Sequence, residues 1–125
     1  MLLLGLLAAA PPAVGQTTPR AIAEIADISG LVTSPDGAWV VYRIERPSTV
    51  ANSIDVDWYI VRADGTKPPR ALGRTGTAMW DDAGTVLPGE AQWASNSQSI
   101  VIRALVDGRI GLWKSKIDGS GFHKI

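Results

Sequence analysis

The stretch SIVIRALVDGRIGLWKSK, which runs from Ser99 to Lys116, decides the fold of this chain. Two runs of alternating, β-prone residues, Ser99–Leu105 and Arg109–Lys116, flank the dipeptide Asp107-Gly108. An Asp-Gly pair between such runs is a strong hairpin signal, because the two turn positions need positive φ angles that Asp and Gly tolerate. The sequence therefore predicts an antiparallel β-hairpin here.

A second copy of this plan lies upstream. Ser34–Gly37 leads into the strand-like run Trp39–Arg43, just as Ala94–Ser97 leads into Ser99–Arg103, with a constant spacing of sixty positions. Internal repeats of this length are typical of architectures in which one supersecondary unit packs against the next. The chain is thus predicted to contain two copies of one β-unit.

The second halves of the two copies also correspond. Trp58–Gly65 parallels Trp113–Gly119, which is one residue shorter, and Arg70–Leu72 parallels His123–Ile125. Each copy contains a turn, a strand, a hairpin connection, a strand, an Asp-Gly turn and a short strand, which is the element order of a propeller blade. The predicted fold class is all-β, with two antiparallel blades of an incomplete β-propeller.

The predicted boundaries follow from these copies. We expect a signal peptide at 1–15, a tether or short helix at 16–27, blade one at 28–72, an inter-blade connection at 73–89 and blade two at 90–125. Thr18 and Pro19 suit the cap and first position of the short helix. Two blades do not close a propeller, so we expect the chain to be a fragment with apolar blade faces uncovered.

Composition excludes several functional classes. The 125 residues carry twelve basic and twelve acidic side chains, so the net charge of zero provides no basic field for nucleic acid. The chain has no cysteine, which excludes disulfides and thiolate metal sites. No motif for a cofactor or a metal ion is found, and we expect neither.

The N-terminus has the pattern of an export signal. Leu2–Ala10 is apolar and too short for a stable membrane span, and Ala13-Val14-Gly15 offers small residues before a cleavage point at Gln16. No Lys or Arg precedes the apolar run, so an apolar N-terminus of a cytosolic protein remains the alternative. Export would place the protein in the periplasm.

No catalytic constellation is present in the sequence. A nucleophile elbow needs Gly-x-Ser-x-Gly, and no such spacing occurs. Ser120 lies in a predicted blade turn, and His123, the only histidine, has no identifiable serine and carboxylate partners. The pair Asp81-Asp82 is expected to be solvated in a turn. We therefore predict no catalytic residue.

The remaining candidates lie between the first pair of strands. The polar segment Glu45–Asp57 is predicted to be a loop of about a dozen residues, and a loop of that length inside a repeat is either a recognition element or disordered. Its candidate substrate contacts are Arg46, Asn52, Asp55 and Asp57. The tryptophans are instead predicted to pack between blades, and Met79-Trp80 and Val86-Leu87 are predicted to be buried anchors. The tryptophans in question are Trp39, Trp58, Trp80, Trp93 and Trp113.

These residues resemble a known family. Ser34–Gly37, Trp93–Asn96 and the Asp-Gly turns at 64–65 and 118–119 resemble the TolB-type blade of prolyl-oligopeptidase-type serine peptidases. More particularly, the N-terminal propeller of lasso-peptide isopeptidases is similar to this chain over 28–125. The segments that carry this likeness are Tyr42-Arg43, Asn52, Trp58–Val61, Pro69–Gly73 and Arg103–Trp113. Asn96-Ser97 departs from the repeat, which prefers Asp-Gly.

The resemblance implies a bacterial periplasmic enzyme with a C-terminal α/β-hydrolase domain. Such an enzyme hydrolyses the isopeptide bond that closes the ring of a lasso peptide, its peptide substrate. The catalytic Ser, Asp and His would belong to the hydrolase domain, so no residue here inherits their roles. A non-enzymatic TolB-like binding propeller and a truncated product without function remain alternatives.

Overall fold

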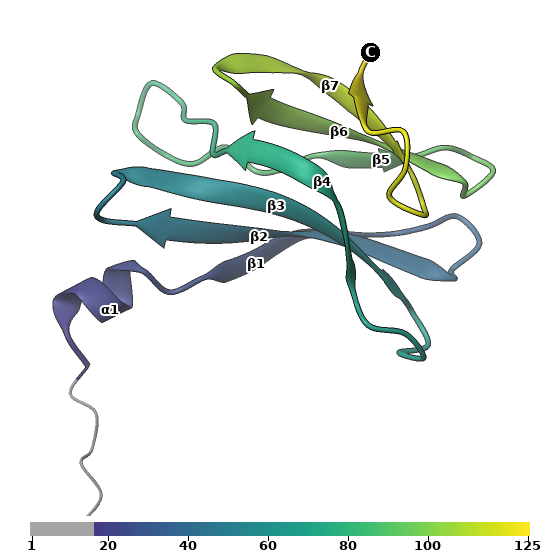
Figure 1. The fold of residues 1–125 in the computed structure, drawn as a ribbon, viewed down its shortest axis with the longest axis horizontal. Coiled ribbons are helices and arrows are strands. Elements are labelled where there is room, and N and C mark those ends of the chain that lie inside the picture. Colours follow the sequence, from purple (N-terminus) through teal and green to yellow (C-terminus); the bar gives the residue numbers. More distant parts are fainter. Residues whose placement is uncertain (1–16) are drawn as a thin grey trace, which may run out of the picture.

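The computed structural model describes residues 17–125, which form one short helix and eight strands (Figure 1). The all-β prediction is confirmed. Within this part of the chain no helix has the length and apolar character needed to cross a membrane. The elements are α1 (Pro19–Ala23), β1 (Asp27–Thr33), β2 (Trp39–Ser48), β3 (Ser53–Arg62), β4 (Arg70–Thr77), β5 (Ala91–Trp93), β6 (Ser99–Val106), β7 (Arg109–Lys116) and β8 (His123–Lys124).

The strands form two antiparallel meanders. Strands β1 to β4 pair in sequence order and make the first unit, and β5 to β8 do the same in the second unit. One residue pair, Thr77↔Leu105, joins β4 to β6 and connects the two units. The sheet is open, which is consistent with two blades of an incomplete propeller.

The hydrophobic core lies between the two units. Trp58 and Ile60 from β3 are 1% exposed, and they belong to the same buried cluster as Ile100 and Ile102 from β6. Half-buried aromatic residues close the cluster: Trp113 and Phe122 stack with ring centroids 5.2 Å apart. Because successive side chains along a strand point to opposite faces, each unit presents one apolar face to the other unit.

The predicted turns are confirmed, and they match each other bond for bond. Gly37 N donates to Ser34 O at a distance of 2.9 Å. Sixty positions later, Ser97 N donates to Ala94 O at the same distance of 2.9 Å. Ser97 adopts the left-handed conformation (φ 56°) that Gly37 adopts in the first copy (φ 71°). Its hydroxyl accepts a hydrogen bond from Asp36 N at 3.2 Å, so the departure from Asp-Gly links the two turns.

The second halves correspond at a spacing of fifty-four, which confirms the predicted match of the Asp-Gly turns at 64–65 and 118–119 but is one residue away from the predicted match of Trp58 with Trp113. Ala63 N donates to Ala38 O, and Ile117 N donates to Gln98 O in the equivalent place. On this alignment Trp58 corresponds to Leu112. The match of Trp58 with Trp113 was wrong because Trp113 pairs with Ile102 and therefore lies on the opposite face of its unit.

The predicted loop Glu45–Asp57 is also wrong. Strand β2 continues to Ser48 and β3 starts at Ser53, so only residues 49–52 form the turn. Pro47 is tolerated because it lies beyond the last β1 partner of β2, Glu45, where one edge of the strand has no ladder partner. The hairpin is six residues longer than the β6–β7 hairpin.

The predicted connection needs correction as well. Strand β4 covers Arg70–Thr77 and therefore takes the first residues of the segment assigned to the connection. Met79 is buried, as predicted, whereas Val86 and Leu87 are half-buried. Trp80 is 54% exposed, however, so it is not a buried anchor, although its backbone pairs with Val86 in an isolated bridge.

Candidate functional site

Three of the four predicted contact residues lie on neighbouring strands near the end of the β2–β3 hairpin. The Arg46 guanidinium donates to Asp57 Oδ2 at 2.6 Å and to the Tyr59 hydroxyl at 3.2 Å. The hydrogen bond to Tyr59 and the carboxylate of Asp57 raise the pKa of Arg46. Tyr59 in turn stacks on Tyr42, with ring centroids 5.7 Å apart. Arg46 is thus held in place along the strand.

Asn52 is not part of this group. It occupies the turn with a φ of 49°, the left-handed conformation that asparagine adopts more readily than most residues. It lines a small hollow with Trp80 and Thr49, away from Arg46 and the aspartates. Its position indicates a role in closing the turn.

Asp55 and Asp57 border a cleft of about 400 Å³ between the two units. Register places Asp55 opposite Thr77 and Asp57 opposite Arg74, both on β4. The other wall comes from the β6–β7 turn, which adds a third carboxylate, Asp107. The lining residues are Asp55, Asp57, Gly76, Thr77, Leu105, Val106, Asp107 and Gly108. An acidic cleft of this kind suits the amide N–H groups or the cationic side chains of a peptide.

Asp107 was not predicted as a site residue. Its sequence signal was that of a turn residue, and it does adopt a positive φ of 49° at the hairpin turn. The cleft forms only because Gly76 lets β4 approach β6: a Cβ atom at Gly76 would lie 1.8 Å from Leu105 O. Nothing in the local sequence around Asp107 indicates this approach.

The described residues show no catalytic arrangement around Ser120 and His123. Ser120 lies in the β7–β8 turn, where its N–H donates to Asp118 Oδ1 at 2.8 Å. The exposed His123 contacts the carbonyl of Gly121, and no carboxylate within 17–125 is hydrogen bonded to it. In the same range no three acidic or histidine side chains gather closely enough to hold a metal ion.

A buried arginine that was not among the predicted site residues holds the first unit to the connection. Arg43 is 5% exposed and forms an ion pair with Glu45. Its Nε donates to Ser29 Oγ at 2.8 Å, and its Nη2 donates to Leu87 O at 3.2 Å. A buried charge with this set of partners is satisfied, so Arg43 is a structural residue.

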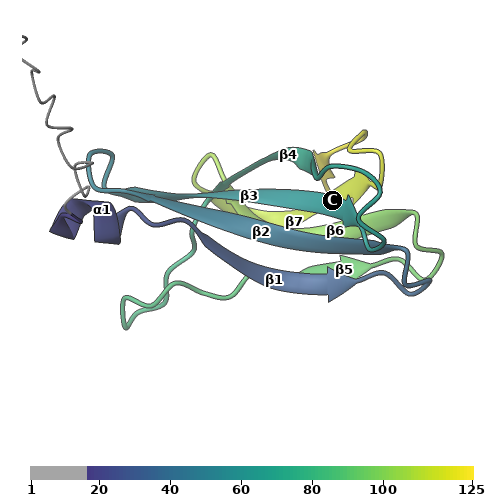
Figure 2. The ribbon, with the colours of Figure 1, turned by 90° about the horizontal axis from the view of Figure 1, so that it is seen from below.

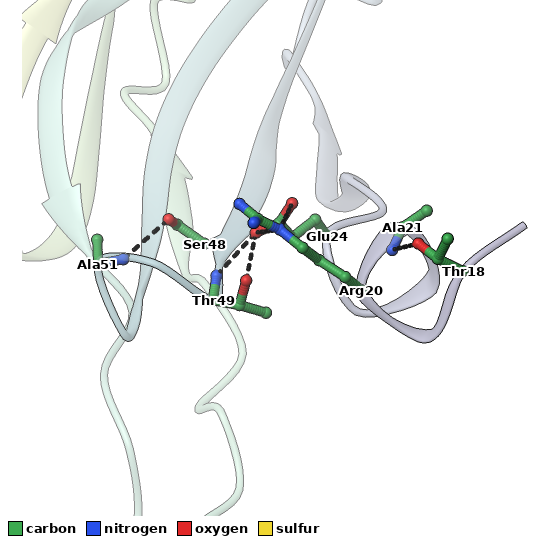
Figure 3. Close-up of polar contacts among 7 residues, drawn as sticks. All are labelled: Thr18, Arg20, Ala21, Glu24, Ser48, Thr49 and Ala51. Carbon is green, nitrogen blue, oxygen red and sulfur yellow. Dashed lines mark hydrogen bonds and ion pairs between the residues drawn. The ribbon is translucent and has the colours of Figure 1, made fainter.

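Helix α1 is fastened to the tip of the long hairpin (Figures 2 and 3). Thr18 caps the helix by accepting from Ala21 N at 3.1 Å, as predicted. Glu24 Oε1 then accepts from the Thr49 hydroxyl at 2.6 Å and from Thr49 N at 3.0 Å. These bonds, with a further contribution from Arg20, lower the pKa of Glu24 from 4.5 to about 2.

Docking of α1 is expected to weaken in acid. Because the folded-state pKa of Glu24 lies below its unfolded value, its contribution is present above pH 4.5 and is lost as the pH falls towards 2. NMR titration of the Glu24 carboxyl should give a midpoint near the lower value. Thr49→Val, which removes the hydroxyl donor, should raise that midpoint, whereas an unchanged midpoint would contradict the assignment.

No family model matches the chain, and no curated protein matches it. Solved structures that are similar to it include two of AtxE2 isopeptidase. One is AtxE2 isopeptidase without ligand, with a TM-score of 0.74, and the other is an AtxE2 isopeptidase variant with Astexin3-dC4 bound, with a TM-score of 0.70. In each case the identity is 19%, and the match covers 86% of this chain and 20% of the AtxE2 chain. At this identity the likeness shows a shared fold. The chain spans about a fifth of the length of the AtxE2 chains that it matches.

Proposed function

We propose that this chain is the N-terminal, peptide-contacting part of an exported serine peptidase of the lasso-peptide isopeptidase type. The fold shared with AtxE2 isopeptidase supports this proposal, as does the family resemblance of the repeat residues. One of the similar structures is an isopeptidase variant with Astexin3-dC4 bound, and the name isopeptidase favours a peptide as the ligand. The two β-units would be TolB-like blades of a propeller, and the catalytic hydrolase domain would be another part of the intact enzyme.

The observation that carries the proposal is the acidic cleft between the two units. Asp55, Asp57 and Asp107 place three carboxylates around a volume of about 400 Å³, which is large enough for one or two side chains of a peptide. Carboxylates accept hydrogen bonds from peptide N–H groups and pair with lysine, arginine or an N-terminal amine. The cleft would thus position a peptide without reacting with it.

The reaction itself would take place elsewhere. Hydrolysis of an isopeptide bond adds one water across the amide, which releases a side-chain carboxylic acid and an amine and opens the ring. This needs an activated nucleophile with a general base, and the described residues contain no such group. The contribution of this chain to catalysis would therefore be to substrate affinity.

Export is the second half of the proposal. Residues 1–15, the predicted signal peptide, lie outside the residues that the structure describes. The apolar run and the small residues before Gln16 support transport to the periplasm, where a peptidase would meet secreted peptides. Mass spectrometry of the mature protein recovered from the periplasm should give an N-terminal peptide that starts at Gln16, as glutamine or its cyclised form.

Neutralising the cleft in the intact enzyme is expected to weaken substrate binding. With Asp55→Asn, the KM for a lasso peptide with a basic residue should rise by about tenfold while kcat stays unchanged, because one charge-assisted contact is lost. Mass spectrometry of the ring-opened product provides the measurement. Asp82→Asn, in the exposed turn before Thr85, is the matched control and should leave KM unchanged.

Two results would contradict the proposal. An intact protein that binds the peptide without opening its ring would instead favour a non-enzymatic TolB-like binding propeller. Equal KM values for the Asp55→Asn and Asp82→Asn variants would show that the cleft does not contribute to substrate binding.

A further inference from the structure

The two β-units differ most at the tips of their central hairpins. In the second unit the dipeptide Asp107-Gly108 joins the paired residues Val106 and Arg109. At the spacings of sixty and fifty-four that relate the units, the eight residues 47–54 replace this dipeptide. Since the second unit forms its meander with the short turn, the added residues are not needed for the fold.

The added residues form a hollow of about 200 Å³. Six of them line it together with Trp80, which belongs to the connection between the units. The hollow shares no lining residue with the acidic cleft, and none of its lining comes from β6, β7 or β8, the strands that a following unit would cover. The lining residues are Pro47, Ser48, Thr49, Asn52, Ser53, Ile54 and Trp80.

Trp80 is held at this hollow by a fixed backbone. The two residues before it, Ala78 and Met79, are 3% and 5% exposed. Ala78 N donates to Ile54 O at 2.8 Å, and Leu87 N donates to Met79 O at 2.7 Å. The Trp80 side chain is nevertheless 54% exposed. An exposed indole on a fixed backbone can contact a ligand with little cost in conformational entropy.

The walls of the hollow suit an apolar and uncharged group. Trp80, Pro47 and Ile54 supply aromatic and aliphatic surface, and none of the seven lining residues is charged. An indole packs favourably against another aromatic ring, in an offset or an edge-to-face arrangement. The volume is sufficient for one side chain. These walls therefore favour a single aromatic side chain as the occupant.

Two of the four polar side chains around the hollow are already engaged within the protein. The Ser48 hydroxyl accepts from Ala51 N at 3.1 Å (Figure 3). The Thr49 hydroxyl donates to Glu24 Oε1 at 2.6 Å. Both hydroxyls therefore hold the tip of the hairpin in place.

The other two polar side chains, those of Asn52 and Ser53, have no hydrogen-bond partner within the described part of the chain. An amide group both donates and accepts, so Asn52 can bind the N–H and the C=O of one peptide unit. A sugar ring presents more hydroxyl groups than two side chains can match. The available polar groups therefore favour a peptide over a sugar.

We propose that this hollow binds an aromatic side chain of a peptide, with its ring against Trp80 and its peptide unit hydrogen bonded to Asn52. The assignment rests on the proposed function only in that the ligand is a peptide. It would add a neutral aromatic residue to the basic residue that the acidic cleft would select. Because the hollow and the cleft share no residue, Asp55→Asn can fail to change KM while the hollow still binds its ligand.

Fluorine NMR of a small probe, N-acetyl-4-fluorophenylalanine amide, tests the site on the purified chain. The probe signal should broaden in a saturable manner, with a Kd of about a millimolar, because a single side chain supplies little binding energy. N-acetyl-phenylalanine amide should displace the probe. N-acetyl-glycine amide and methyl glucoside should not, because neither carries an aromatic ring.

Two substitutions locate the bound probe. Trp80→Ala should weaken binding at least about tenfold, because the ring contact is lost. Asn52→Gly keeps the left-handed turn and removes the amide, so it should weaken binding by about threefold to tenfold. Ile110→Ala, which truncates a side chain on β7 that is 55% exposed, is the matched control and should leave binding unchanged.

A third variant replaces residues 47–54 by Asp-Gly, the turn of the second unit. It should lose binding of the probe, while circular dichroism and cooperative urea unfolding show that the strands remain. Three results would each overturn the proposal: no saturable binding to the unchanged chain, equal binding by Trp80→Ala and Ile110→Ala, or displacement of the probe by methyl glucoside.

Discussion

Trp58→Ala is expected to lower the free energy of unfolding by about 3 to 5 kcal/mol, the range measured for large aromatic truncations in cores. Trp58 is 1% exposed and lies in the cluster shared by both units, so the cavity would open between the two units. The atoms around this cavity belong to paired strands, which cannot move separately to fill it. Since small domains are only marginally stable, we expect this variant to keep only a small part of the stability of the unchanged chain.

Urea denaturation followed by circular dichroism measures this effect. The matched control is Trp80→Ala, which removes the same side chain from a position that is 54% exposed. It should cost less than about 1 kcal/mol, as surface substitutions usually do. Equal losses for the two variants would contradict the placement of the core between the units.

Gly76→Ala is expected to separate the two units where β4 meets β6. The added Cβ would lie 1.8 Å from Leu105 O and 2.8 Å from its carbonyl carbon, and neither backbone atom can rotate away. The residue also has a φ of 93°, which an alanine adopts only with strain. We expect a loss of about 2 to 4 kcal/mol, from overpacking and strain together.

Hydrogen exchange localises the effect. Amides of Thr77 and Leu105, the residues that pair β4 with β6, should lose protection in Gly76→Ala, while amides in the middle of the β6–β7 hairpin keep theirs. Gly84→Ala is the control, because Gly84 has a similar φ of 77° and no atom within 4 Å of an added Cβ. It should show the cost of the strain alone, about 1 kcal/mol. A larger loss for Gly84→Ala would refute the steric argument.

Local signals explain why much of the fold could be predicted. The turns at Asp107-Gly108 and Asp118-Gly119 depend on residues within four positions of each other, and a single sequence contains that information. The strand limits at Ser48 and Ser53 were missed because Pro47 and the acids suggested a loop. The alternation from Ser53 to Trp58 has the period of two that indicates a strand, and it outweighs those residues.

The site was less predictable because it depends on contacts between distant residues. Spacing alone places Asp55 and Asp57 on one face of a strand, and the structure brings both to the cleft. The third carboxylate, Asp107, comes from the other unit, and its approach requires the missing side chain of Gly76. The partners of Arg43, which include Leu87 forty-four positions later, are equally invisible to a local pattern.

The sequential pairing of the strands has a consequence for synthesis on the ribosome. Each of β1 to β4 pairs only with its neighbour in sequence, apart from the one contact of Thr77 with Leu105. Loop closure within the first meander is therefore short, and its ladder can form as soon as Thr77 has left the exit tunnel. Its apolar face around Trp58 stays uncovered until Ile100 and Ile102 have been translated. During this interval the nascent chain exposes apolar surface, so it is prone to aggregation and benefits from a chaperone.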